Sequence, residues 1–243
     1  MTVLGLAVVV HAADVAALLR DARAAEAGMD ARGALQLYLK ADAVQPDDPF
    51  ILQKIARQYS DLVEEQPSLE DRKSYAQAAV EFSQRAVTRD PKNAVNVLSL
   101  AISHGKLALC SDTRTKLAYS RLVKAETEQA LALDPNYAWA HHVLGRWHCE
   151  VASLGTTSKF VVRLLYGGLP PASVETGIRE LVRATELEPD ELNHWIELGF
   201  AYATAGQPAQ ARRHWQHGLA MPSRSKPDEA AKRRAREAPA RLD

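Results

Sequence analysis

The chain has 243 residues, of which 47% are hydrophobic and 25% are charged, so it can bury a core and does not belong to the disordered class. Its 30 basic residues are balanced by 30 acidic residues, which argues against a protein that holds nucleic acid by bulk charge. Aromatic residues make up only 6% of the chain and alanine is abundant. This composition favours helices that pack closely through small side chains.

The chain begins with a short apolar run from Val3 to Val10, followed by small residues of the kind that a signal peptidase prefers. No basic residue precedes this run, and it is too short to span a bilayer. Two interpretations remain. Residues 1–13 are a truncated secretory signal of an exported or periplasmic protein, or they are an ordinary buried segment of a cytoplasmic one. We expect no transmembrane segment elsewhere.

A repeated helix ending organises the rest of the chain. Four segments consist of Ala, four further residues and Pro, and they cover residues 41–46, 86–91, 130–135 and 184–189. Proline stops a helix and biases the preceding residue away from the α region. A new amphipathic pattern follows each proline, so the chain is predicted to be a series of helical repeats.

The last repeat matches the tetratricopeptide signature, in which Trp-x-x-Leu-Gly-x-x-Tyr is followed by Ala-x-x-x-Phe and then by Pro. Only a tryptophan in place of phenylalanine departs from it in residue type. A Gly-Gln-Pro turn at 206–208 separates the two expected helices. The matching residues are Trp195, Leu198, Gly199, Tyr202, Ala211, Trp215 and Pro222.

These patterns predict an all-α, tetratricopeptide-type α-solenoid of about five helical pairs, because one pair cannot bury its own apolar face. The repeats are expected at about 14–47, 48–92, 93–136, 137–190 and 191–222. The middle repeats exceed the usual period of about 34 residues. The largest insertion runs from Ser153 to Pro171 and reads as a short amphipathic helix ended by glycines and prolines. Residues 223–243 are predicted to be a charged capping helix or tail.

From about Asp134 to Pro222 the sequence resembles the regulator of microtubule dynamics family. The similar stretches include LGRW at 144–147, YGGLPPAS at 166–173 and the segment from Leu181 to Pro189. This resemblance implies a helical solenoid with a concave ligand groove. It also implies eukaryotic relatives that associate with microtubules or lie at organelle contacts, one of which binds phospholipid in its solenoid.

No stretch of the sequence carries a catalytic motif. It contains no nucleophile motif, no glycine-rich phosphate loop, no HExxH segment and no EF-hand loop. We therefore expect a protein that is not an enzyme and has no cofactor.

Histidines cluster in two places without the pattern of a metal site. His141, His142, His148 and Cys149 lie close together, as do His214 and His217. A zinc site needs several converging ligands with supporting partners, whereas His141 and His148 occupy positions that normally hold packing aromatics. We therefore expect no metal. Cys110 and Cys149 are interpreted as structural thiols, with a disulfide as the alternative in an exported protein.

The first helices of tetratricopeptide repeats line the concave face, so counting from the signature residues predicts a ligand groove. Its lining is basic and apolar with almost no acidic groups, which suits a protein or peptide partner with acidic and apolar side chains. The alternative ligand is an anionic phospholipid or another amphipathic molecule. In a further alternative, Arg57 and Arg146 are surface arginines paired with nearby carboxylates. The predicted lining residues are Arg23, Phe50, Arg57, Lys106, Trp139, His142, Arg146, Ile196 and Phe200.

The insertion between Ser153 and Pro171 could act as a lid on this groove. Its candidate covering residues are Phe160, Leu164, Leu165 and Tyr166. The alternative is that they pack on the outside of the fourth and fifth repeats, as apolar stripes at helical spacing usually do.

Overall fold

The computed structural model describes the backbone of residues 3–238 and the side chains of residues 14–238 except 156 and 160. Every regular element within this part is a helix, so the predicted all-α class is confirmed. The helices are α1 (Val3–Ala27), α2 (Ala31–Val44), α3 (Pro49–Leu62), the 3-10 turn η1 (Val63–Glu65), α4 (Leu69–Arg89), α5 (Ala94–Leu109), α6 (Thr113–Leu133), α7 (Ala138–Ala152), α8 (Thr156–Tyr166), α9 (Val174–Leu187), α10 (Leu192–Thr204), α11 (Pro208–Ala220) and α12 (Lys226–Glu237).

The chain divides into two compact units, residues 1–111 and 112–243. The first unit contains α1 to α5 and the second contains α6 to α12. The division falls between the two helices of the predicted third repeat, and the repeat boundaries themselves stay a prediction. The four tryptophans of the chain all belong to the second unit.

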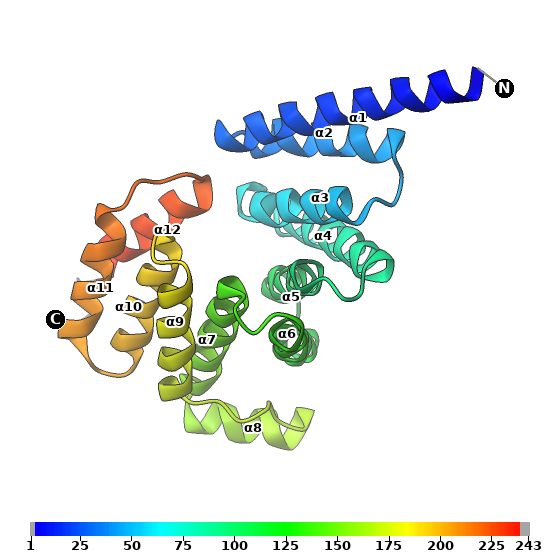
Figure 1. Ribbon diagram of the computed structural model, residues 1–243. Coiled ribbons are helices and arrows are strands. Elements are labelled where there is room, and N and C mark those ends of the chain that lie inside the picture. The colour runs from blue at the N-terminus through cyan, green and yellow to red at the C-terminus, as the bar shows by residue number, and fades with distance from the viewer. Residues whose placement is uncertain (1–2, 239–243) are drawn as a thin grey trace. The chain divides into compact units, whose positions relative to one another are not determined.

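In the first unit α1 pairs with α2, and α3 pairs with α4 (Figure 1). Aspartates cap two of these helices, since Asp30 accepts a hydrogen bond from the Gly33 amide and Asp48 accepts from the Phe50 and Ile51 amides. Pro49 then takes the first position of α3, where a missing amide hydrogen costs nothing. The core of this unit is built from alanines, branched aliphatic side chains and one tyrosine, namely Val15, Ala22, Ala34, Leu35, Tyr38, Ala41, Ile51, Ile55 and Leu62.

Within this unit α3 contacts the C-terminal end of α1 and also contacts α5. Lys54 of α3 forms an ion pair with Glu26 of α1 at 3.2 Å. On its other side α3 contacts α5, where the buried hydroxyls of Ser60 and Ser103 lie 3.4 Å apart. We call the surface formed by the C-terminal end of α1 together with α3 and α5 the α1–α3–α5 face.

In the second unit α7 pairs with α9, and α10 pairs with α11 (Figure 1). Glycines of the repeat signature permit both contacts. A Cβ atom on Gly145 of α7 would lie 2.8 Å from the carbonyl oxygen of Gly177 on α9, and a Cβ atom on Gly199 would lie 2.3 Å from Cδ1 of Trp215. The signature glycine is therefore required by the close approach of the two helices.

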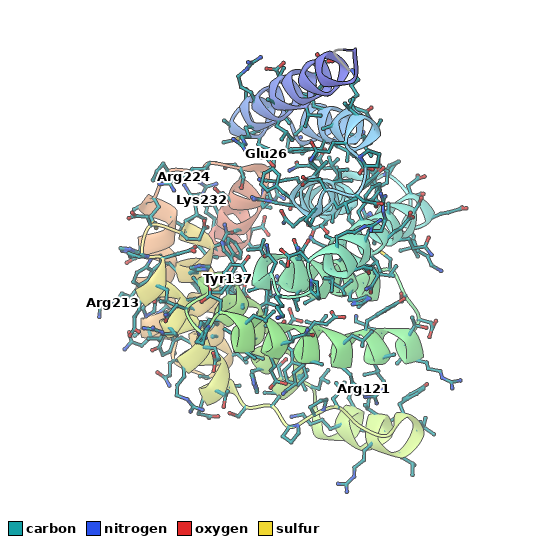
Figure 2. The ribbon with its side chains drawn as sticks, turned by 45° about the vertical axis from the view of Figure 1, so that its right-hand side comes forward. Glu26, Arg121, Tyr137, Arg213, Arg224 and Lys232 are labelled. Carbon is teal, nitrogen blue, oxygen red and sulfur yellow. The ribbon has the colours of Figure 1, made fainter. Side chains whose placement is uncertain are left out.

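The charged tail forms α12, which packs against α10 and α11. A capping box starts the helix, in which Ser225 and Asp228 exchange side-chain and backbone hydrogen bonds. Asp228 is only 6% exposed and also accepts hydrogen bonds from the Arg224 amide at 2.7 Å and from the Asn193 side chain at 2.8 Å. Lys232, labelled in Figure 2, donates to the carbonyl oxygen of Met221.

The expected helix within the large insertion is confirmed as α8. It ends at Gly167. The φ angles of Gly167 (+76°) and Gly168 (+80°) lie in the left-handed region, which glycine adopts freely. Arg121 of α6 reaches toward this end of α8 (Figure 2). It donates to the carbonyl oxygen of Tyr166 and, from Nε at 3.1 Å, to that of Gly168. The end of α8 is thus tied to α6.

Two further features concern the part of the chain that the structure describes. Within it, no helix is both long enough and apolar enough to cross a membrane. Cys110, half-buried, and Cys149, buried, are both free thiols. The segment 1–13 that was interpreted as a signal lies outside the described side chains.

Candidate functional site: a basic and apolar helix face

Four of the predicted groove residues, Arg23, Phe50, Arg57 and Lys106, belong to the first unit, and two of them, Arg23 and Phe50, are in contact. The Phe50 ring is 42% exposed at the start of α3. The Arg23 guanidinium of α1 lies 5.6 Å from the ring centroid, and the Lys54 ammonium lies 5.8 Å from it. Both distances allow cation–π attraction. An exposed aromatic ring is therefore flanked by one cation from α1 and one from its own helix.

Carboxylates accompany the other cations of this face. Arg57 pairs with Asp61 at 3.8 Å, one turn along α3, and Lys106 of α5 pairs with Glu64 at 2.7 Å. The counted lining positions hold no carboxylate, but two of their cations have a carboxylate beside them, one helical turn away on α3 or on η1. The alternative in which Arg57 is a surface arginine with a nearby carboxylate matches the geometry.

Glu26 of α1, labelled in Figure 2, is a third carboxylate on this face. It accepts a hydrogen bond from the Gln58 side chain at 2.7 Å in addition to its contact with Lys54. Burial, together with this nearby carboxylate, raises the pKa of Tyr38 above its ordinary value. Glu26 thus sets the position of Lys54 beside Phe50.

The second unit places its five predicted groove residues differently. Ile196 is 1% exposed in the core shared with Trp215. The Phe200 ring lies between Trp215, with centroids 5.2 Å apart, and the Arg234 guanidinium of α12, 4.5 Å away. The helix α12 therefore lies against the part of α10 that was predicted to face a ligand.

Trp139 and His142 of α7 belong to a buried aromatic cluster with His194 of α10. The Trp139 ring centroid lies 5.0 Å from that of His142 and 4.9 Å from that of His194. The two histidines approach each other with their Nδ1 atoms 3.0 Å apart. Burial lowers the pKa of His142 to about 3 and that of His194 to about 2, so both rings are neutral at ordinary pH.

Arg146 is the exposed member of the predicted set in the second unit, and its Nε donates to Glu150 at 2.7 Å. The candidate surface is consequently the α1–α3–α5 face of the first unit, where Phe50 and its cations are accessible. The groove as a whole stays a prediction.

Of the predicted lid residues, Leu164 is 70% exposed and Leu165 is 64% exposed. These two side chains are therefore not buried against another part of the described structure. Tyr166 is half-buried, and Phe160 lies outside the described side chains.

Three further histidines contact aromatic rings or a carboxylate. His141 Nδ1 lies 2.6 Å from Glu180, and this hydrogen bond raises the His141 pKa. His214 stacks on Tyr202 with centroids 5.1 Å apart, and His217 lies 4.2 Å from the Trp195 ring. Among the described residues, no three His, Cys, Asp or Glu side chains converge in a way that could hold a metal ion.

The pair of His142 and His194 was not anticipated from the sequence. The two residues are separated by the whole α8 insertion, and no local spacing connects them. The available signal was indirect, because the first helices of successive repeats lie side by side and a histidine on each could meet its counterpart.

Helices that pair in this way, with small residues at each crossing, define a tetratricopeptide-type α-solenoid. The structure is similar to a thermophilic TPR protein of Thermus thermophilus, with a TM-score of 0.68 and 20% sequence identity, over 92% of this chain and 98% of that one. It is also similar to MamA from Desulfovibrio magneticus, with a TM-score of 0.51 and 15% identity, over 85% of this chain and 93% of that one. At these identities the likeness shows the fold.

The family follows from the sequence comparison. The model of regulator of microtubule dynamics protein 1-3 matches residues 18–242, and the chain belongs to this family. It is 28% identical to regulator of microtubule dynamics protein 3 of Xenopus laevis over 158 residues, which are 65% of this chain and 34% of that protein. It is 27% identical to protein 3 of Bos taurus over 220 residues, which are 89% of this chain and 47% of that protein. The chain thus spans less than half the length of these relatives.

Proposed function

We propose that this chain is a non-enzymatic scaffold that binds a protein or peptide partner on the α1–α3–α5 face of its first unit. The observation that carries the proposal is the exposed Phe50 ring between Arg23 and Lys54. Exposed aromatic and arginine side chains are enriched among the residues that dominate protein interfaces.

The chemistry of this face defines the partner. An apolar side chain would cover the open side of the Phe50 ring, and an acidic side chain would lie near Arg23 or Arg57. Arg57 is already paired with Asp61 on the surface. A carboxylate of the partner would therefore replace Asp61 rather than add a new ion pair. We therefore assign most of the binding energy to the aromatic ring and attribute partner selection to the cations.

The family relation supports a scaffold role. The relatives are named as regulators of microtubule dynamics, and this makes microtubules the first partner to test. Co-sedimentation of the full chain with microtubules, lost in Phe50→Ala, would identify them as the partner.

The general test is quantitative affinity capture with the full chain from a cell extract. Phe50→Ala and Arg57→Glu should each deplete the same specific proteins. Two exposed residues of α4 provide matched controls, because Leu69 is 65% exposed and Lys73 is exposed on the second helix of the pair. Leu69→Ala and Lys73→Glu should leave capture unchanged. Equal capture by all four variants and the unaltered chain would remove the α1–α3–α5 face from the proposal.

A further inference from the structure

The helix α8 and the first half of α6 form a second surface in the unit 112–243, separate from the face proposed above. Of the nine large hydrophobic side chains that are exposed in the described part of the chain, three lie on α8. They are Val161 at 41%, Leu164 at 70% and Leu165 at 64% exposure. Residues three and four apart share one side of a helix, so these three form a single apolar stripe.

The charge of this surface has one sign. Residues 113–125 and 153–174 contain no Asp or Glu. They do contain six basic residues, namely Arg114, Lys116, Arg121, Lys124, Lys159 and Arg163. Such a concentration is notable in a chain with formal net charge +0.

Three of these cations are engaged within the unit. Arg121 holds the carbonyl oxygens of Tyr166 and Gly168, Lys124 pairs with Glu128, and Lys159 donates to the Ala152 carbonyl oxygen at 2.7 Å. Arg114, Lys116 and Arg163 form no ion pair within the described residues. Their charge is therefore available to a ligand.

A hollow separates the two helices. It has a volume of about 470 Å³ and is lined by Arg114, Ala118, Arg121, Leu165 and Tyr166. Pockets that hold ligand groups span roughly 300–1,000 Å³. This hollow can accept one or two large apolar side chains, with an arginine at its edge to meet an acidic group.

We propose that the α6–α8 surface binds an acidic amphipathic helix of a partner protein. An apolar side chain of that helix enters the hollow beside Leu165, its apolar stripe covers Val161 and Leu164, and a flanking carboxylate pairs with Arg114 at the edge of the hollow. This is the helix-in-groove mode, in which residues at helical spacing act as anchors. A flat anionic bilayer would meet the same charges and leucines, but it would not fill a hollow, and for this reason we favour the protein partner.

The experiment is a selection of displayed random 16-residue peptides against the full chain carrying Phe50→Ala and Arg57→Glu. These two substitutions disable the α1–α3–α5 face of the proposed function, so the result of this selection does not depend on that proposal. The expected enriched peptides are acidic and amphipathic. Their affinity should fall at least about tenfold in Leu164→Ser and in Arg114→Glu.

Two substitutions within the same unit serve as controls. Leu133 is 39% exposed at the end of α6, and Arg213 is exposed on α11. Leu133→Ser and Arg213→Glu should leave the peptide affinity unchanged. Tryptophan fluorescence, which reports only on this unit, verifies that each variant is folded.

Three results would overturn the proposal. The selection yields no enriched peptides, or the enriched peptides lack acidic residues, or they bind the Leu164 and arginine variants as well as the parent chain. A parallel arm uses phosphatidylcholine vesicles with and without phosphatidylserine. Leu164-dependent binding to the phosphatidylserine vesicles, without Leu164-dependent peptide binding, would assign the surface to a membrane instead.

Discussion

The Nδ1 atoms of His142 and His194 lie 3.0 Å apart between α7 and α10, and both side chains are buried. One ring must donate its hydrogen to the other, because two Nδ1–H groups would face each other if both rings were protonated. Arg146 and Arg234 add positive potential near His142. The Glu188 carboxylate lies 3.5 Å from His194 Nε2, which is long for a hydrogen bond. This environment therefore favours the neutral form of both His142 and His194.

This pair makes the second unit sensitive to mild acid. The pKa values of about 3 and about 2 in the folded state lie below the value of about 6.5 in the unfolded chain. Above pH 6.5 neither state binds these protons, so stability is fully present. As pH falls below 6.5, the unfolded state binds protons first, and the free energy of unfolding drops by up to about 1.4 kcal/mol per pH unit for each histidine. Urea unfolding followed by tryptophan fluorescence between pH 5 and 7 measures this slope.

The double variant His142→Gln/His194→Gln should lose most of the slope, whereas His217→Gln at an exposed site should keep it. His141 acts in the opposite direction, because Glu180 raises its pKa and the stability it contributes is lost as pH rises. The same slope in the double variant and the parent chain would refute the assignment to this pair.

A methyl group at Gly199 should destabilise the second unit. The added Cβ would lie 2.3 Å from Cδ1 of Trp215, a ring that is only 2% exposed and cannot move aside. Overpacking of this kind costs about 1–3 kcal/mol. The urea midpoint of Gly199→Ala, read by tryptophan fluorescence, should fall accordingly with little change in the m-value.

The matched control for this substitution is Gly155→Ala. A Cβ at Gly155 has no atom within 4 Å, so the change in unfolding free energy should stay within about 0.5 kcal/mol. Equal effects of the two substitutions would mean that the contact between Gly199 and Trp215 is not the cause.

Removing the charge of Asp228 should loosen α12. This carboxylate accepts hydrogen bonds from the Arg224 and Ser225 amides and from Asn193 of α10. Asp228→Asn should cost about 1–2 kcal/mol, because a helix cap and a buried acceptor are weakened together. Hydrogen exchange of the α12 amides should accelerate. Glu229→Gln, at the exposed neighbouring position, should leave exchange unchanged, and faster exchange there as well would point to a general charge effect.

Local spacing was sufficient to predict the last helical pair, α10 and α11, and the helix α8. The signature from Trp195 to Pro222 is read within one repeat, and the glycines after Tyr166 mark a helix end wherever that helix packs. These features depend on residues that are close in sequence. The all-α class and the family resemblance follow from them.

The environment of the predicted face depended on information that spacing lacks. Arg57 finds Asp61 one turn away on its own helix, whereas Lys54 finds Glu26 on another. Ile196 and Phe200 lie where α12 docks. The buried apolar side chains of this tail are all alanines, so its polar sequence predicted a helix without indicating its position. Long-range packing therefore decided which candidate residues are exposed.

The close approach of α7 and α9 has a consequence for the chemistry of Cys149. Its sulfur atom lies where a Cβ atom on Gly177 would be only 2.4 Å away, and burial raises the pKa of its thiol to about 12. An alkylating reagent reacts with the thiolate form, and we expect it to reach this sulfur only after the two helices separate. Cys110, in the other unit, is only half-buried. The rate of alkylation at Cys149 would thus measure how often α7 and α9 transiently separate.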